Sequence, residues 1–244
     1  MAKPRPEPLS DAALPPPRKA PTPRATSRAN GDVTRERILD AAETLFGYGT
    51  FDAVSLRDIT EEAGVTLALA SYHFGSKENL FAQTVARRAG VLNTMRRERL
   101  AVLPPHASTR DVLDAFMRPL FDQMNRGEAG WQSYLFIISK LAQGNRWLNL
   151  LREHFDETAR LFLDRLGQTL PTIPRPQLLR GFALALDCML QTLSKNRRLD
   201  SLSDGEVSAD QLAQAYEALM LFSVAGLEGL RPTELPAKGK SQRT

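Results

Sequence analysis

The 244-residue sequence contains a single cysteine, Cys188, and only three histidines, His73, His106 and His154. One cysteine excludes an internal disulfide and a thiolate metal cluster, and the scattered histidines show no ligand spacing, so we expect no metal site. No run of eighteen or more apolar residues is present, which argues against a membrane-spanning helix. The first residues also lack the apolar core of a signal peptide, so we expect a cytoplasmic protein.

Signals of catalysis are missing as well. The sequence has no P-loop, no GxSxG, no HExxH and no glycine-rich dinucleotide fingerprint. His154 and Asp156 are two positions apart and would face different sides of a helix, so they do not form a dyad. We therefore expect no catalytic residues and no cofactor.

Proline is concentrated at the start of the chain, because residues 1–31 hold eight of the sixteen prolines. Such a segment cannot form a helix and has too little apolar content to fold alone. We expect a disordered basic arm over residues 1–31, which either touches DNA through Arg24 and Arg28 or is a plain solvated tail. A second disordered basic tail is expected over residues 231–244.

The stretch from Thr34 to Leu80 has the pattern of a helix-turn-helix, in which the second helix of the motif lies in a DNA major groove. Gly64 supplies the positive φ that the turn between the two helices needs. Ser76 caps a fourth helix that begins at Lys77. The three helices before it are expected over Arg35–Tyr48, capped by Thr34, over Ser55–Ala63, and over Thr66–Phe74.

The third of these helices carries the candidate DNA contacts. Ala68 lets a backbone approach closely, and one of Leu67 and Leu69 must face outward, with Leu67 the favoured one. Lys77 lies beside a helix N-terminus, an arrangement that suits a phosphate. Hydrogen-bonding groups that could reach DNA are Thr66, Ser71, Tyr72 and His73, although Tyr72 and His73 could instead pack in the core.

Residues 34–80 resemble the DNA-binding domain of the TetR family of bacterial transcriptional regulators, through the pieces RERILDAAETLF, SLRDITEEAGV and YHFGSKENL. By this resemblance the segment from Thr66 to Phe74 is the recognition helix. Tyr72 and His73 match the family's phosphate-contacting aromatic pair, and Lys77 matches its phosphate lysine. The resemblance also implies that Ser55 and Arg57 contact the DNA backbone. Thr50 departs from the pattern, since members usually have glycine there.

The rest of the chain is predicted to be helical. A long helix over 77–102 carries a basic run (Arg87, Arg88, Arg96, Arg97 and Arg99) that we interpret as a solvated face. Further helices are expected over 111–126, 131–143, 146–170, 177–195 and 208–230, with Ser208 as the cap of the last and a loop over 196–207. The helix over 177–195 is apolar nearly all round, which indicates burial on both faces.

Aromatic and methionine side chains on the inward stripes of these helices suggest a cavity for an apolar or acyl/aromatic effector. Ordinary core is the alternative for each of them. Asp187, in an otherwise apolar helix, could orient a ligand. The candidate ligand-binding residues are Phe116, Leu120, Met124, Trp131, Tyr134, Ile138, Trp147, Leu151, Phe155, Phe182, Leu186 and Met189.

Taken together, the sequence predicts an all-α protein with a helix-turn-helix domain over 32–80 and a ligand-binding and dimerisation domain over 81–230. The expected function is that of a ligand-responsive transcriptional regulator, more specifically a repressor. It would bind a palindromic operator on double-stranded DNA and be released by its effector. The family pairs its last two helices into a homodimer interface, and this sequence suits that arrangement. The alternatives are a non-sequence-specific architectural DNA-binding protein and a helical small-molecule-binding protein or enzyme with a vestigial DNA motif.

Overall fold

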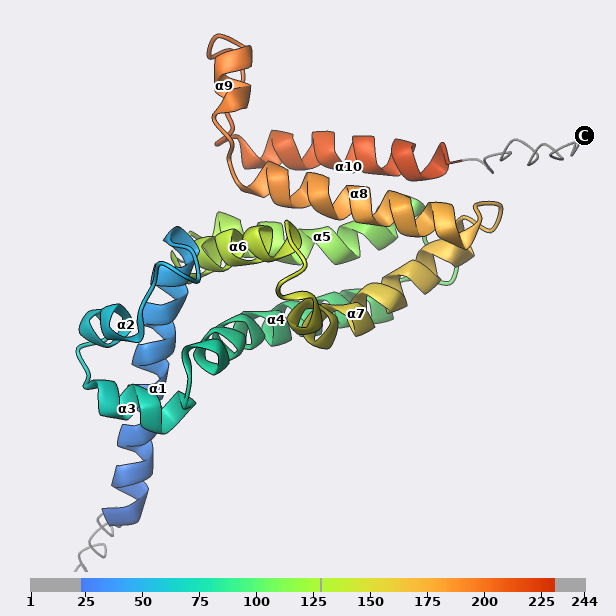
Figure 1. Ribbon diagram of the computed structural model, residues 1–244. Coiled ribbons are helices and arrows are strands. Elements are labelled where there is room, and N and C mark those ends of the chain that lie inside the picture. Colours follow the sequence, from blue (N-terminus) through green and yellow to red (C-terminus); the bar gives the residue numbers. More distant parts are fainter. Residues whose placement is uncertain (1–22, 128, 231–244) are drawn as a thin grey trace, which may run out of the picture.

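The computed structural model describes residues 23–127 and 129–230, and within that part of the chain the regular structure is entirely helical. Figure 1 shows an elongated arrangement, with α2 and α3 at one end and α8 and α10 packed side by side at the other. No helix among the described residues is both long and apolar enough to cross a membrane. The described residues form ten helices: α1 (Pro23–Tyr48), α2 (Leu56–Glu62), α3 (Leu67–Phe74), α4 (Lys77–Ala101), α5 (Thr109–Asn125), α6 (Ala129–Ala142), α7 (Leu148–Thr169), α8 (Arg175–Leu193), α9 (Arg198–Leu202) and α10 (Leu212–Glu228).

Serine caps fix the start of several helices. Ser55 and Asp58 form a reciprocal capping box at α2, and Ser108 and Asp111 form another at α5. Ser76 accepts a hydrogen bond from the amide of Asn79 at the start of α4. Gly64 turns the chain between α2 and α3 with φ of 61°, a value that costs glycine little and other residues more.

The first helix begins earlier than the sequence predicts. We expected a start at Arg35 capped by Thr34, with residues 1–31 disordered, but α1 begins at Pro23. Proline is tolerated in the first turn of a helix, and no further proline follows it in α1. The Thr34 hydroxyl donates to the carbonyl oxygen of Asn30 at 2.9 Å, a bond made inside a helix and not at a cap. Residues 1–22 and 231–244, where the arm and the tail were expected, lie outside the described residues.

The last two predicted helices also differ in detail. The segment 196–207, expected as a loop, contains the short helix α9, which projects away from the body (Figure 1). The final helix starts at Leu212 with Gln211 at the cap position, and Ser208 does not cap it. Ser208 instead hydrogen-bonds Asp200, which also accepts from Arg197 and the amide of Ala209 and so holds this segment together.

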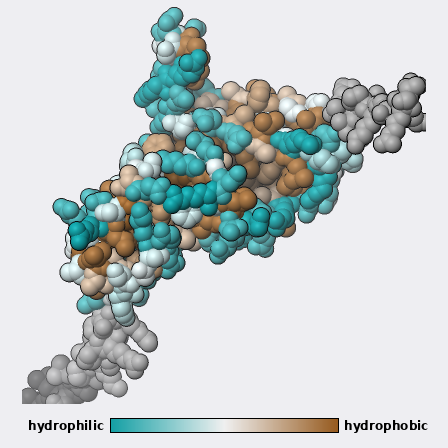
Figure 2. Space-filling model, in the orientation of Figure 1, coloured by the Kyte–Doolittle hydropathy of each residue, from teal (hydrophilic) through white to brown (hydrophobic). Residues whose placement is uncertain are grey.

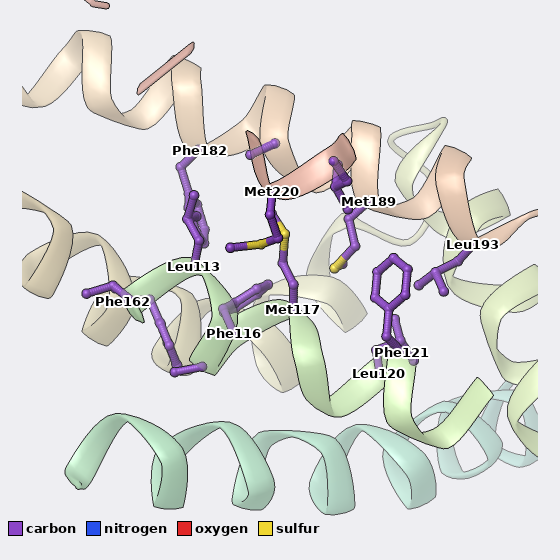
Figure 3. Close-up of a cluster of buried hydrophobic side chains, with 14 of the residues drawn as sticks. Leu113, Phe116, Met117, Leu120, Phe121, Phe162, Phe182, Met189, Leu193 and Met220 are labelled. Atoms are coloured by element: carbon purple, nitrogen blue, oxygen red, sulfur yellow. The ribbon is translucent and has the colours of Figure 1, made fainter. Parts of the chain in front are cut away.

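Two hydrophobic clusters divide the interior. The larger one is built around α5 and joins α4, α7, α8 and α10, with Phe116 packed edge-on against Phe162 and Phe182 (Figure 3). The smaller one fills the space between α1, α2, α3 and the start of α4. This second cluster is completed by Ile137 and Leu141 of α6 and Leu150 of α7, so α1, α2 and α3 share a core with the body.

Glycine permits the close crossing of α1 and α6. A Cβ on Gly47 would lie 2.7 Å from both Cα and Cβ of Ser133, closer than real side-chain atoms approach. Beside this crossing, the ammonium of Lys140 donates to the carbonyl oxygens of Gly47 at 2.6 Å and Gly49 at 2.7 Å. The end of α1 is therefore held against α6 by both packing and hydrogen bonds.

Candidate DNA-binding surface and effector cavity

Helix α3 has one buried face and one exposed face. Ala70 and Phe74 are buried in the smaller cluster. The opposite face is open to solvent and presents Thr66, Leu67, Ala68, Leu69, Ser71 and Tyr72. Leu67 and Leu69 are 41% and 39% exposed, so both leucines point outward, where we favoured Leu67 alone.

Tyr72 is the most exposed of the large apolar and aromatic side chains on this face, with 83% of its surface accessible. This placement excludes the alternative in which Tyr72 packs in the core. His73 is half-buried, and its ring lies edge-on to that of Tyr72, with centroids 5.2 Å apart. A tyrosine hydroxyl held out in solvent beside the motif is well placed to bond a phosphate oxygen.

Lys77 ties the start of α4 to the segment between α1 and α2. Its ammonium donates to the carbonyl oxygens of Phe51 at 2.9 Å and Val54 at 3.0 Å, and it lies 4.3 Å from the centre of the Phe51 ring. These two bonds use two of the three donors of the ammonium group. Lys77 therefore has a structural role, and its contact with a phosphate stays a prediction.

Helix α2 lies beside α3 at the same end of the molecule (Figure 1). Ser55 and Arg57 are both exposed there. The Ser55 oxygen accepts a hydrogen bond from the Asp58 amide at the start of α2. Thr66 stands at the cap position of α3 but makes no capping hydrogen bond, so its hydroxyl is available to a ligand.

A cavity of about 270 Å³ lies in the body between α4, α5, α6, α7 and α8. Its walls are largely apolar, and six of the twelve predicted ligand-binding residues line it: Phe116, Ile138, Leu151, Phe155, Leu186 and Met189.

The other six predicted ligand-binding residues lie elsewhere. Leu120, Phe182 and Met124 belong to the main core. Trp131 and Tyr134 pack edge-on against each other, with Trp131 under the Arg88 guanidinium. Trp147 lies against Phe51 and Phe81 in the smaller cluster. Helical periodicity identified these side chains as inward-facing, but it does not tell which inward-facing side chains border a void.

The cavity also contains a charged residue that we expected on a solvated face. Arg96 lines it and is only 4% exposed. A signal was available in the sequence, because Arg96 follows Leu92 by four residues and so shares the buried stripe of α4. Asp187 lines the cavity as predicted, but it is exposed, and Asp156 joins it.

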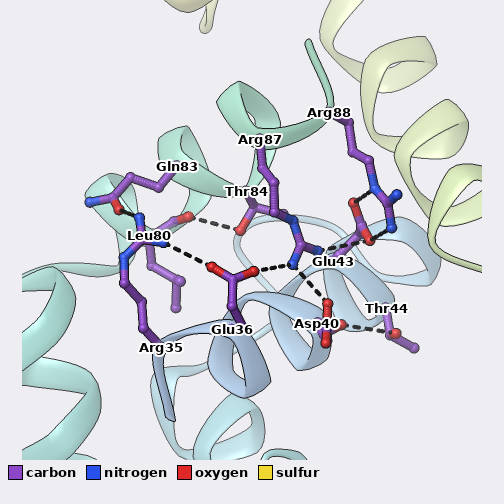
Figure 4. A network of polar contacts seen from close by, with 10 residues as sticks. All are labelled: Arg35, Glu36, Asp40, Glu43, Thr44, Leu80, Gln83, Thr84, Arg87 and Arg88. Carbon is purple, nitrogen blue, oxygen red and sulfur yellow. Dashed lines mark hydrogen bonds and ion pairs between the residues drawn. The ribbon is translucent and has the colours of Figure 1, made fainter. Parts of the chain in front are cut away.

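A network of ion pairs joins α4 to α1 (Figure 4). Arg87 donates to Asp40 at 2.7 Å and to Glu36 at 3.2 Å, and both Arg87 and Arg88 bond the carboxylate of Glu43 at 2.9 Å. Glu43 is 2% exposed, so this carboxylate is desolvated and held by two guanidinium groups. The network therefore couples the helix that lines the cavity to the first helix of the DNA-binding unit.

Two family models match the chain. The model described as bacterial regulatory proteins, tetR family, matches residues 38–84, and the model described as tetracyclin repressor-like, C-terminal domain, matches residues 114–226. A curated relative, the HTH-type transcriptional regulator BetI of Agrobacterium fabrum, is 27% identical over 204 residues, which are 82% of this chain and 94% of that protein.

Solved structures of similar fold include a putative transcriptional regulator from Pseudomonas aeruginosa PAO1, with a TM-score of 0.53 and 19% identity over 83% of this chain and 95% of that one. Another is the fatty acid degradation regulator FadR from Bacillus halodurans, with a TM-score of 0.54 and 13% identity over 80% and 96%. At these identities the likeness shows the fold: an N-terminal helix-turn-helix followed by a helical body. With both halves of the chain matched by its models, the protein belongs to the TetR family of bacterial transcriptional regulators.

Proposed function

We propose that the protein is a homodimeric repressor that binds a palindromic operator and releases it when a small molecule occupies the cavity in the body. The observation that carries the DNA-binding part is the two-sided character of α3, whose inner face is buried and whose outer face is solvent-exposed. Two such helices, one from each subunit, would enter successive major grooves about 34–36 Å apart. We place this regulator in the cytoplasm, where its DNA is.

We assign different tasks to the residues of this surface. Ser55, Arg57 and Tyr72 would bond phosphate oxygens and set the position of α3 on the duplex. Thr66, Leu67, Ala68 and Ser71 would face the base edges, where leucine and alanine can contact thymine methyl groups. Because few hydrogen-bonding groups lie on this face, DNA shape would contribute to specificity. His73 would act mainly by supporting the Tyr72 ring.

An apolar surface supports the homodimer. Leu184 of α8 and Leu221 and Phe222 of α10 are about two-thirds exposed, and Figure 2 shows brown and tan atoms along the edge formed by these helices. A groove of about 530 Å³ between α8, α9 and α10 adjoins Phe222. Exposed apolar patches of this kind mark protein interfaces, and the same face of a second copy would cover both patches by two-fold symmetry.

The proposal is tested with fluorescence anisotropy of the full chain on duplex DNA from upstream of its own gene, with random duplex as the control. We expect binding about a thousandfold tighter to the former at physiological salt. Equal affinity for the two duplexes would favour the architectural DNA-binding protein over the regulator of a nearby operator. A selection of bound fragments from random DNA then decides between a regulator with a distant operator and an architectural protein, because an architectural protein enriches no particular sequence.

Single substitutions test the contact assignments. Arg57→Ala should lower the slope of log Kd against log salt by about 0.9, the value for one phosphate contact. Tyr72→Phe should weaken binding about fivefold on all duplexes, through the loss of one hydrogen bond. Tyr48→Phe is the matched control, because Tyr48 is also exposed but lies at the far end of α1. Equal effects of the two tyrosine variants would contradict the assignment.

A further inference from the structure

Arg96 is held rigidly at the wall of the cavity. Its Nε donates to the carbonyl oxygen of Phe116 at 2.9 Å, and its guanidinium carbon lies 3.7 Å from the centre of the Phe116 ring. Both contacts come from α5 and fix the plane of the guanidinium group. The Nε bond leaves the two terminal nitrogens, Nη1 and Nη2, as a pair of donors with a defined geometry.

The charge of Arg96 has no acidic partner within residues 23–127 and 129–230. Among the described residues no carboxylate lies within ion-pair distance of Arg96, and neither Nη atom donates a hydrogen bond. Other arginines of the same helix differ, since Arg87 and Arg88 pair with Glu43 and Arg99 pairs with Asp122 at 2.9 Å. Burial lowers the pKa of Arg96 to about 10, which still leaves it charged at neutral pH. A desolvated cation without a partner is costly, and an anion beside it would remove that cost.

The two acidic residues that line the cavity do not form an ion pair with Arg96. Asp156 is half-buried and pairs with Arg160 at 2.8 Å, one helical turn further along α7. Asp187 is exposed on α8. Both carboxylates therefore lie at the rim, whereas the interior combines one cation with apolar walls.

A second buried polar group of the body also lacks a partner. The hydroxyl of Tyr134 is fully buried and has no hydrogen-bond partner among the described residues. Burial raises the pKa of Tyr134, and the positive charge of Arg96 opposes that rise. Tyr134 lies outside the cavity wall, so the ligand site itself is assigned from Arg96 alone.

We propose that the effector is an amphipathic monocarboxylate, whose carboxylate is bound end-on by the two Nη atoms of Arg96 and whose apolar chain lies among Phe116, Ile138, Leu151 and Leu186. The guanidinium fork matches a carboxylate with two parallel hydrogen bonds. A water-sized group takes about 30 Å³, so the cavity volume suits an acid of roughly eight carbons. This inference rests on the proposed function only in assigning the ligand a regulatory role.

The test is isothermal titration calorimetry of the full chain with hexanoate, octanoate and decanoate as probes. Octanamide is the control ligand with the same chain and a neutral head group, and octyltrimethylammonium is the control ligand with a cationic head group. Arg96→Met removes the charge at similar volume. Arg97→Met is the control, because Arg97 is the next residue of α4, is exposed and donates to Thr158 Oγ1 at 3.1 Å outside the cavity.

Octanoate should bind the wild type and Arg97→Met alike and bind Arg96→Met at least about 30-fold more weakly, as expected for a buried charge pair that has lost one partner. Octanamide should bind the wild type more weakly than octanoate does and should lose little affinity in Arg96→Met. Should Arg96→Met fail to fold, Arg96→Lys keeps the charge without the fork and should bind octanoate about tenfold more weakly.

Three results would overturn the inference: equal octanoate affinity in the wild type and Arg96→Met, tighter binding of octyltrimethylammonium than of octanoate, or no binding of any of the three acids. Operator binding, measured separately by anisotropy, distinguishes the two proposals. Specific DNA binding without carboxylate binding refutes the ligand class alone. Carboxylate binding without any specific DNA binding refutes the proposed function alone.

Discussion

Replacing Glu43 by glutamine would test whether the network between α1 and α4 stabilises the protein. The buried carboxylate accepts three hydrogen bonds, from Nε and Nη2 of Arg88 and from Nη2 of Arg87, each at 2.9 Å. A glutamine of the same shape keeps one oxygen, which can still accept from Arg88 Nε. Its NH₂ group would face the two Nη2 donors, so two charge-assisted bonds are lost.

The magnitude follows from these bonds. A hydrogen bond to a charged group contributes about 1.5–3 kcal/mol, and removing one partner of a buried pair costs about 3–5 kcal/mol. Arg87 keeps Asp40 and Glu36 as partners, whereas Arg88 has Glu43 as its only carboxylate partner among the described residues. We therefore expect Glu43→Gln to lower the free energy of unfolding by about 3 kcal/mol, near the low end of that range.

Urea unfolding followed by far-UV circular dichroism measures this loss, at one fixed protein concentration because dimerisation contributes to stability. Asp40→Asn is the control, since Asp40 pairs with the same arginine but is exposed and should contribute less than about 1 kcal/mol. A loss below about 1 kcal/mol for Glu43→Gln, or equal losses for the two variants, would refute the reasoning.

Three further predictions concern other parts of the molecule. Gly47→Ala should destabilise the fold by about 1–3 kcal/mol, measured by thermal unfolding, because the new methyl group would collide with the Ser133 backbone. Hydrogen bonds from the backbone and hydroxyl of Ser55 hold the pKa of Asp58 below 3.8, so its contribution is present above pH 3.8 and is lost as the pH falls further. The difference in Tm between the wild type and Asp58→Asn should therefore be largest at pH 7 and smaller at about pH 2. A difference that does not change with pH would contradict this prediction. Phe222→Glu should yield a monomer in sedimentation velocity, and a persisting dimer would place the interface elsewhere.

Helix caps and glycines allowed much of the fold to be predicted, because their effect is local. Ser55, Ser76 and Gly64 set the boundaries of α2, α3 and α4 close to the expected positions. The predicted start of the first helix at Arg35 was wrong because Thr34 was interpreted as its cap. A threonine hydroxyl can also bond a carbonyl oxygen one turn back inside a helix, and the sequence does not distinguish the two arrangements.

The candidate sites were harder to predict, because they depend on contacts between distant segments. Lys77 was predicted to bind phosphate from its place at a helix start, and the sequence did not indicate that its ammonium also bonds carbonyl groups more than twenty residues earlier. The interpretation of the basic run of α4 as a solvated face was wrong for Arg96. Its spacing from Leu92 indicated the buried stripe of α4, and the packing of α5 against α4 encloses it. Half of the predicted cavity residues are core, because a stripe of inward side chains does not reveal where the packing leaves a void.

The shared core around α1 has a consequence for cooperativity. Ile137, Leu141 and Leu150 complete the hydrophobic cluster of the DNA-binding helices, so residues 32–80 alone would expose apolar surface that the intact chain covers. Calorimetry should accordingly show these helices melting together with the body in one transition. A ligand bound in the cavity would raise the melting temperature of α1, α2 and α3 as well, although it touches none of them, because stabilising any part of a cooperative unit stabilises the whole.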